Sequence, residues 1–333
     1  MFLLSTAQFT NYLRSKWIPR SCVCKGEPVT VCLFVTDRCT LSCKWCLRQN
    51  DQSLITNTRP DMTLEQSKKI LSYFPKATHL SFSSFGEPLL VDDLFKIMFE
   101  FKKRPMRISL ITNGTLLSTR IDEIIDSGLH RISISMNSLN SAEYQTICGG
   151  NENIFNDALS GIQSLVARRR SSGPHIHVSF VLTRDLFDRA QEIIRFAEEM
   201  MVDSLDLHNM IQHNPKGAYG GMLMTDDREV AEKLSEWCKK KYRIRVGWPK
   251  LVQKGLKTPA KVCKHLWDWL GVDMEGNTAG CSKAMPTREK YGNLFREGSQ
   301  SWNNDFRKKL RSSFLRGDMF LLDCCKTCTE VQP

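Results

Sequence analysis

Short apolar runs alternate with amphipathic stretches along the chain from Val29 onward. The apolar runs that we expect to form strands cover residues 29–36, 79–85, 107–113, 131–137, 175–183 and 204–211. Helical spacing of apolar positions occupies residues 63–74, 92–103, 119–126, 154–168 and 186–200 between them. This regular β–α alternation predicts an α/β fold with a parallel sheet.

The expected strands have one apolar and one polar face. In the run 131–137, Ile132 and Ile134 share one face, whereas Ser133, Ser135 and Asn137 share the other. We expect the apolar face to pack on helices outside the sheet, and the polar face to line a cavity inside it. The alternative is a half-exposed strand, but parallel strands are usually covered on both faces.

The pattern divides the chain into four parts. Residues 1–28 are expected to be a lead-in, and residues 29–214 hold the β–α alternation. Residues 215–250, with one amphipathic helix over 227–240, are expected to connect it to residues 251–333. That last part combines short irregular pieces with a second group of cysteines, and we expect it to be a small domain of its own.

The amino-acid composition limits the classes of protein to which the chain can belong. The 333 residues are 41% hydrophobic, and no apolar run approaches the roughly 18 residues of a membrane span. Without an export signal, the thirteen cysteines are better explained as reduced thiols or metal ligands than as disulfides, and we expect a cytoplasmic protein. The net charge of +11 is dispersed, and its only tight runs lack interleaved aromatics, so nucleic-acid binding is not favoured.

The first group of cysteines follows the first expected strand. Cys39, Cys43 and Cys46 have the spacing C-x3-C-x2-C. Three thiolates on one short loop can hold three irons of a [4Fe–4S] cluster and leave the fourth open to an external ligand. A structural zinc loop is the alternative for such spacing.

This loop resembles the defining motif of the radical S-adenosylmethionine (SAM) superfamily, including an aromatic residue, Trp45, before the last cysteine. The resemblance implies a partial (β/α)6 TIM-like barrel over residues 29–214, with Trp45 near the adenine of SAM. It also implies reductive cleavage of SAM to a 5′-deoxyadenosyl radical that abstracts hydrogen from a substrate C–H. An external reductant, such as flavodoxin or ferredoxin, would supply the electron.

Other strand ends carry motifs similar to those of the same family. Gly86, Glu87 and Pro88 resemble its Gly-Gly-Glu-Pro motif, which binds the methionine amine of SAM, although Phe85 replaces the first glycine. Taken alone, Gly-Glu-Pro is more often a plain turn.

Two further strand ends follow the family pattern. Thr112 and Asn113 resemble its Thr-Asn-Gly, and Ser135 and Asn137 occupy positions that contact the ribose or methionine carboxylate. Asn137 replaces the usual acid, and the alternative for each residue is a hydrogen-bonded turn. His208 is a candidate substrate contact, although a lone histidine is more often structural.

The second group of cysteines resembles the SPASM/twitch extension of radical SAM enzymes. Cys263, Cys281, Cys325 and Cys328 provide one full set of four thiolates, with Cys324 as an alternative ligand. The resemblance implies that residues 251–333 hold one auxiliary [4Fe–4S] cluster, and a zinc ribbon is the alternative.

The net reaction is left open by these motifs. We expect oxidation (dehydrogenation) or epimerisation of a small molecule, and Cys148 is a candidate hydrogen donor for epimerisation. Relatives that modify peptides often carry an N-terminal domain that binds the leader of the peptide, and the lead-in is short for such a domain. We therefore expect a small-molecule substrate. If a partner protein bound the leader instead, the substrate could be a ribosomally made peptide. A non-catalytic zinc-binding, nucleic-acid-binding module is the alternative of another class.

Overall fold

The computed structural model describes residues 4–17, 20–46, 59–83, 85–171, 173–210, 221–254, 263–281, 291–318, 325 and 328–331. Its strands are β1 (Thr30–Phe34), β2 (His79–Ser83), β3 (Arg107–Thr112), β4 (Arg131–Ser135), β5 (His175–Leu182), β6 (Ser204–Asn209), β7 (Arg245–Gly247), β8 (Trp269–Val272) and β9 (Thr278–Ala279). Its α-helices are α1 (Thr6–Trp17), α3 (Leu64–Ser72), α4 (Leu94–Lys102), α5 (Leu117–Asp126), α6 (Ser141–Cys148), α7 (Glu152–Arg168), α8 (Ala190–Glu199), α9 (Arg228–Trp237), α10 (His265–Asp268), α11 (Leu294–Glu297) and α12 (Asp305–Leu315). Three 3-10 helices are η2 (Pro88–Leu90), η3 (Arg184–Arg189) and η4 (Gly298–Asn303).

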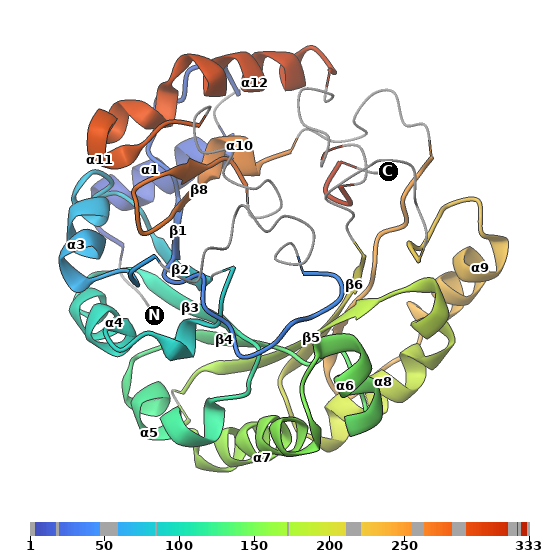
Figure 1. Cartoon of the computed structure of the whole chain (residues 1–333). Helices are drawn as coiled ribbons and strands as arrows, with labels where there is room; N and C mark the ends of the chain where they lie inside the picture. The colour runs from blue at the N-terminus through green and yellow to red at the C-terminus, as the bar shows by residue number, and fades with distance from the viewer. Residues whose placement is uncertain are drawn as a thin grey trace.

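The strands form one sheet in the order β7-β6-β5-β4-β3-β2-β1-β8-β9. Every neighbouring pair from β7 to β8 is parallel, and only β9 runs antiparallel to its neighbour. The strands curve into an incomplete ring with helices α3 to α9 outside it (Figure 1). This arrangement confirms the expected α/β partial barrel. None of the helices that the structure describes is long and apolar enough to cross a membrane.

The six expected strands and the helices between them are confirmed, each within a few residues of its bounds. The helix expected over residues 186–200 is shorter in the structure, because that stretch begins with η3 before α8 starts at Ala190. The lead-in contains α1, whose Gln8 donates a hydrogen bond to the carbonyl of Ala77 at 3.0 Å. The helix α6 and the short strand β7 were not expected.

The two faces of the strands differ as expected. Leu80, Ile108 and Ile132 are fully buried and belong to one core with Ile97 and Phe101 of α4. Polar residues alternate with such apolar ones and point to the inside of the ring, where Ser135 Oγ lies 3.4 Å from Ser179 Oγ. The outer face of the sheet is therefore covered by apolar packing against the helices, whereas the inner face is polar.

The C-terminal part of the chain joins the same sheet. Strand β8 pairs in parallel with β1, with Thr30 opposite Trp269. Beyond it, the Arg59 guanidinium lies 3.4 Å from Asp37 and 3.8 Å from Asp273, and so links the segment after β1 to the turn between β8 and β9. Residues 269–279 thus extend the barrel at its β1 edge, with α11 and α12 outside them (Figure 1).

Candidate functional site

The loop with the first cysteines leaves β1 at the end of the barrel where the parallel strands terminate. Two backbone hydrogen bonds fix it to the end of α6: Ser42 N donates to Cys148 O at 3.0 Å, and Lys44 N donates to Ile147 O at 2.9 Å. Cys46 N donates to Cys43 O at 3.0 Å and closes a turn between the last two cysteines. The three thiols are therefore held on one short, anchored segment.

The sulfur of Cys39 lies among hydrogen-bond donors. Leu41 N is 3.5 Å and Asn113 Nδ2 is 3.6 Å from Cys39 Sγ. Donors of this kind stabilise a thiolate, which is the form that binds iron. In the described parts of the chain, no three His, Cys, Asp or Glu side chains already converge as a metal site, so the structure shows the thiols on one loop and not a finished ligand geometry.

A buried hydroxyl lies near the same loop. Tyr144 on α6 is fully buried, and its hydroxyl has no hydrogen-bond partner among the described residues. Burial raises the pKa of Tyr144, and the thiols of Cys148, Cys43 and Cys39 raise it further. A buried donor without an acceptor, beside thiols of the right type, fits a cluster whose sulfur atoms accept hydrogen bonds.

Glu87 connects two of the expected cofactor motifs. Its carboxylate accepts hydrogen bonds from Thr112 Oγ1 at 2.6 Å, Asn113 N at 2.7 Å and Leu89 N at 3.0 Å. The side chain is 1% exposed, and burial raises its pKa while these hydrogen bonds oppose the shift. Glu87 therefore lies behind the motif and orients Asn113, and its side chain is not turned toward a ligand.

Gly86 allows this turn to touch the cysteine loop. Gly86 N donates to Thr36 O at 3.2 Å and Glu87 N donates to Arg38 O at 2.7 Å. A Cβ added at Gly86 would lie 1.9 Å from Arg38 O, so only glycine fits. Phe85, which replaces the usual glycine, packs on Phe34 with ring centroids 5.0 Å apart. The turn is thus formed without the first glycine, and Pro88 begins η2.

The end of β4 separates the roles expected for Ser135 and Asn137. Ser135 faces the barrel interior beside Ser179. Asn137 has a φ of 57°, and its side-chain oxygen accepts a hydrogen bond from Val181 N at 2.8 Å. Asn137 thereby satisfies a backbone amide of β5, and its left-handed conformation is one that asparagine tolerates well.

A cavity of about 530 Å³ opens at the ends of β5, β6 and β7. Its apolar wall includes Trp45, Val181, Met210 and Trp248, and His208 is among its polar lining residues. Trp45 belongs both to the cysteine loop and to this wall, so the cavity adjoins the first cysteine group. Its volume lies within the range of small-molecule pockets.

Asp206 lines this cavity, and its carboxylate is held in place by His177 and Arg131. His177, which is 1% exposed, places Nε2 3.3 Å from Asp206 Oδ2, and Arg131 lies 3.9 Å from the same oxygen. The hydrogen bond from His177 holds the pKa of Asp206 below its ordinary value of 3.8. A Cβ at Gly247 would lie 2.1 Å from Asp206 Oδ1, so glycine leaves room for this second oxygen in the cavity wall.

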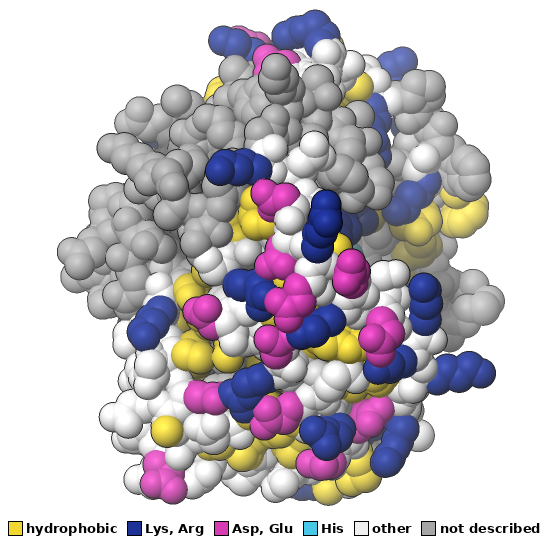
Figure 2. All heavy atoms as spheres, turned by 90° about the vertical axis from the view of Figure 1, so that its right-hand side faces the viewer, with side chains coloured by type: hydrophobic (Ala, Val, Ile, Leu, Met, Phe, Trp, Pro, Cys, Tyr) yellow, Lys and Arg dark blue, Asp and Glu magenta, His cyan; other side chains and the backbone are white. Residues whose placement is uncertain are grey.

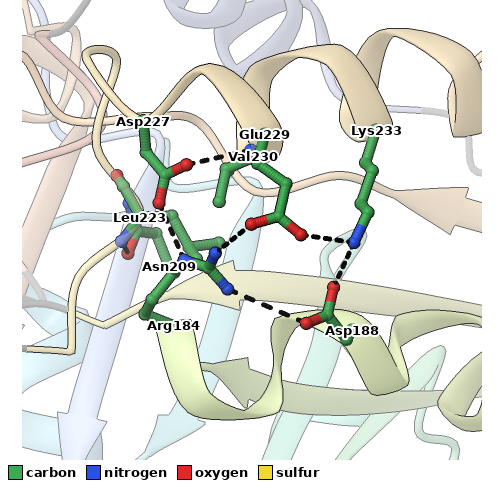
Figure 3. Close-up of polar contacts among 8 residues, drawn as sticks. All are labelled: Arg184, Asp188, Asn209, Leu223, Asp227, Glu229, Val230 and Lys233. Carbon is green, nitrogen blue, oxygen red and sulfur yellow. Dashed lines mark hydrogen bonds and ion pairs between the residues drawn. The ribbon is translucent and has the colours of Figure 1, made fainter.

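Asn209, at the end of β6, fixes the rim of the cavity. Its side-chain nitrogen donates to Leu223 O at 2.8 Å and to Lys250 O at 2.9 Å, and its oxygen accepts from Leu223 N at 2.9 Å. Asn209 is 4% exposed. One buried amide therefore joins β6 to two later segments around the opening, and Figure 3 draws it beside one of them, at Leu223.

Outside this rim, an ion-pair network joins η3 to the start of α9 (Figure 3). Arg184 lies 2.7 Å from Asp227 and 2.6 Å from Glu229, and Lys233 lies 2.6 Å from Glu229 and 2.7 Å from Asp188. These groups are partly exposed, so each pair contributes little alone. Basic and acidic side chains also interleave over this face of the molecule, so the net positive charge is not gathered there (Figure 2).

The second cysteine group lies around α12. Cys325 and Cys328 are buried with Tyr291, Leu310 and Phe314 in one apolar cluster, and Cys263 packs against it. Cys281 follows β9 by two residues. The set includes thiols only, which suits an iron–sulfur or zinc site. Cys324 lies outside the described residues.

Cys148 is separated from the cavity. Its thiol is 1% exposed and contacts Met136 O at 3.9 Å, behind the cysteine loop, and Cys148 does not line the cavity. Its expected role as hydrogen donor therefore gains no support from its position. The residues that the sequence did not single out are Tyr144, His177 and Gly247; the alternating pattern of β5 placed His177 on the inner face but gave it no role.

Comparison with known proteins identifies the class of the chain. A family model described as Radical SAM superfamily matches residues 33–197, which include the cysteine loop, Glu87 and Asn113. Residues 33–197 therefore form a radical SAM domain, and members of that superfamily use a [4Fe–4S] cluster and SAM.

The curated relatives that match the chain include two that each cover about 55% of it. The "Tungsten-containing aldehyde ferredoxin oxidoreductase cofactor-modifying protein" of Pyrococcus furiosus is 27% identical over 191 residues, 55% of this chain and 52% of the relative. A "Probable GTP 3',8-cyclase" of Metallosphaera sedula is 30% identical over 185 residues, 55% of each chain. The chain thus spans about half the length of these relatives.

Solved structures extend the likeness of fold. SuiB of Streptococcus suis has a TM-score of 0.66 at 14% identity, over 91% of this chain and 72% of its own. The structure of anSMEcpe with bound AdoMet has a TM-score of 0.62 at 16% identity, over 90% and 83%. The shared fold therefore reaches well beyond residues 33–197.

Proposed function

We propose that this enzyme cleaves SAM reductively to a 5′-deoxyadenosyl radical, which abstracts hydrogen from a C–H bond of a small molecule bound in the cavity. One observation carries the proposal: Trp45 belongs to the cysteine loop and also to the cavity wall. A radical formed at the loop would therefore meet a substrate in the cavity directly. The polar interior and anchored loop support the same assignment.

We assign the residues that would hold the two cofactors as part of the same proposal. Cys39, Cys43 and Cys46 would bind three irons, and the fourth would take the amine and carboxylate of SAM. When bound, the two cofactors would supply the 5′-deoxyadenosyl radical, whose formation uses one electron from a reductant such as flavodoxin or ferredoxin. The backbone of Gly86, with Asn113, Ser135 and Trp45, would surround SAM, whereas Glu87, Thr112, Pro88 and Asn137 would act by holding these groups in place.

The substrate would be anchored by Asp206. With Oδ2 engaged by His177 and Arg131, the carboxylate presents Oδ1 beside Gly247 at the cavity wall. Its low pKa keeps it ionised at neutral pH, so it would accept a hydrogen bond from a hydroxyl or ammonium group of the substrate. Apolar contacts with Val181, Met210 and Trp248 would exclude water from the reacting C–H.

We favour oxidation over epimerisation as the net reaction. Oxidation requires the substrate to lose one electron and one proton after the hydrogen atom, and an auxiliary cluster on Cys263, Cys281, Cys325 and Cys328 would accept that electron. Epimerisation requires a hydrogen donor beside the substrate, and the thiol of Cys148 does not line the cavity. A peptide substrate is the competing hypothesis.

The test is anaerobic reconstitution followed by assay of 5′-deoxyadenosine with dithionite as reductant. We expect about eight irons per chain, from two cubanes, and SAM cleavage by the parent chain. The variant Cys39→Ala/Cys43→Ala/Cys46→Ala should lose cleavage, whereas Cys325→Ala/Cys328→Ala should lose about half of the iron and still cleave SAM without substrate. Cleavage by the first variant, or redox-silent zinc at its loop in the parent, would sink the proposal.

The substrate class is tested in the same assay. Deuterium exchange into 5′-deoxyadenosine from small molecules of a deuterium-labelled cell extract supports the small-molecule assignment. Exchange only from the fraction retained by dialysis would favour a peptide instead. An Asp206→Asn variant that keeps uncoupled SAM cleavage and loses this exchange would support Asp206 as the anchor.

A further inference from the structure

Two arginines are buried on one face of α12, beside the second cysteine group. Arg307 and Arg311 are four residues apart on the helix and are 2% and 1% exposed. Leu310 and Phe314 lie on the same face and belong to the apolar cluster of Cys325 and Cys328. The buried face of this helix therefore combines apolar packing with two guanidinium groups.

Only neutral acceptors hold Arg311. It donates to Leu266 O at 2.8 Å, Trp302 O at 2.9 Å and Asn303 Oδ1 at 2.8 Å. Its guanidinium also lies 4.7 Å from the ring centroid of Trp302. These contacts satisfy its hydrogen-bonding groups but, among the described residues, place no carboxylate against its charge, which Cys22 and Cys24 compensate only in part.

Arg307 is less completely satisfied. One terminal nitrogen, Nη2, donates to Thr278 Oγ1 at 3.0 Å and to Ala279 O at 3.2 Å. Its Nε is buried and has no hydrogen-bond partner in the described part of the chain. Within those residues, no carboxylate lies at ion-pair distance from Arg307 or Arg311.

Two buried like charges without a carboxylate at ion-pair distance among the described residues are unfavourable, and nearby Cys24 and Glu297 oppose only part of that cost for Arg307. Burial, followed by repulsion from Arg311, lowers the pKa of Arg307 to about 9. Ring contacts with Tyr291 at 5.1 Å and Trp302 at 5.4 Å compensate only part of this cost. Buried cations are normally retained where an anion lies against them, so this pair indicates an anion at the same place.

The backbone around the arginines carries the cysteines. Arg307 donates a hydrogen bond to the carbonyl of Ala279, two residues before Cys281. Arg311 donates one to the carbonyl of Leu266, three residues after Cys263. Both guanidiniums thus lie against the segments that carry two of the four thiols, on the helix that packs with the other two. The donor set and the orphaned Nε together fit an anionic cluster of thiolates.

We infer that Arg307, supported by Arg311, is the counter-charge of the auxiliary iron–sulfur cluster and raises its reduction potential. The inference rests on the proposed function. A cubane with four thiolates is negatively charged, and reduction adds negative charge, so a buried cation stabilises the reduced form more than the oxidised form. The Nε–H of Arg307 would also donate to a cluster or cysteine sulfur. A raised potential suits a cluster that must accept an electron from the substrate.

The test uses the full chain carrying Cys39→Ala, Cys43→Ala and Cys46→Ala, in which only the second cysteine group can hold a cluster. Arg307→Met, Arg307→Lys and Lys308→Met are compared in this background by iron and sulfide content and by an EPR-monitored redox titration. Lys308 is the matched control, because it is a neighbouring cation on the same helix whose side chain is 42% exposed. Arg307→Gln replaces Arg307→Met if the methionine variant does not retain a cluster.

We expect Arg307→Met to lower the reduction potential of the second cluster. At a fixed solution potential, the ratio of reduced to oxidised cluster should fall at least tenfold, which corresponds to about 59 mV for one electron. Arg307→Lys should restore most of this shift, and Lys308→Met should leave the potential close to that of the parent. An unchanged potential in the uncharged variants, or no recovery with lysine, overturns the inference. The inference is also overturned if the chain with the three first-group substitutions assembles no second cluster. The proposed function is decided separately, by SAM cleavage in the parent chain, whose first cysteine group is intact.

Discussion

Cys39 receives hydrogen bonds from neutral groups, the side chain of Asn113 and the backbone of Leu41, whereas two guanidiniums are buried beside the second cysteine group. Both groups consist of thiols near buried polar atoms that lack a partner among the described residues, Tyr144 at the first and Arg307 at the second. The two regions therefore share their ligand chemistry and differ in the charge that the protein places around it.

This difference follows from what each cluster must do under the proposed function. The first cluster would bind SAM, whose sulfonium group is cationic, so the ligand itself brings positive charge to the loop. A fixed protein cation at that place would repel the cofactor. The second cluster would be saturated by four thiolates and receive no ligand, so the protein must compensate its charge.

The largest effect is expected from Gly86→Ala, because its methyl group would meet Arg38 O at 1.9 Å and push the turn away from the cysteine loop. We expect SAM cleavage to fall to background and the iron of the first cluster to be lost, while the second cluster stays. Iron content and EPR of the reconstituted chain measure this. Gly317→Ala is the comparison for backbone strain without a collision, since its φ is 80° and its added methyl meets no described atom within 4 Å. Equal loss of both clusters would show that the two regions are not independent.

A smaller effect is expected from Asn113→Leu, which removes the neutral donor to Cys39 and keeps the branched shape of the side chain. Loss of such a supporting contact typically costs about 10- to 100-fold in metal affinity or activity. The measurement is the rate of 5′-deoxyadenosine formation together with iron retention against a chelator. Thr115→Val is the control, because it removes a hydroxyl that donates to Asn113 Oδ1 at 2.8 Å and leaves the contact with Cys39 in place. An unaffected rate would mean that the neutral surroundings of Cys39 have no role.

The sequence predicted the parts of this molecule that depend on local patterns. Alternation of apolar residues indicated strands such as β4, and the spacing of Cys39, Cys43 and Cys46 was enough to indicate the chemistry of their loop. Pairing of β8 with β1 was not predictable in this way, because it joins Thr30 to Trp269 across most of the chain. Helix α6 was not predicted, because its buried residues, Tyr144, Ile147 and Cys148, span little more than one turn.

The charge around the second cysteine group was hidden for a different reason. Arg307 is one of 47 lysines and arginines, and its residue type alone does not separate a buried cation from the many exposed ones. Only the packing of α12 against the cysteine segments shows that it is buried. The same holds for Gly247, whose role emerges only once Asp206 is placed beside it.

The smallest effect is expected from Tyr144→Phe, which removes the buried hydroxyl that lacks a partner among the described residues. In the chain without clusters, this removal should raise the free energy of unfolding by about 1 kcal/mol, because a buried polar group without a hydrogen bond is relieved of its desolvation cost. In the reconstituted chain, a cluster sulfur would accept that hydrogen bond, so the gain should vanish. Thermal unfolding of both forms under anaerobic conditions gives the difference. Tyr242→Phe is the control, since its hydroxyl already donates to Trp237 O at 3.2 Å and its loss should destabilise both forms equally. If Tyr144→Phe stabilises the two forms alike, its hydroxyl does not serve the first cluster, and the parallel with Arg307 at the second is lost.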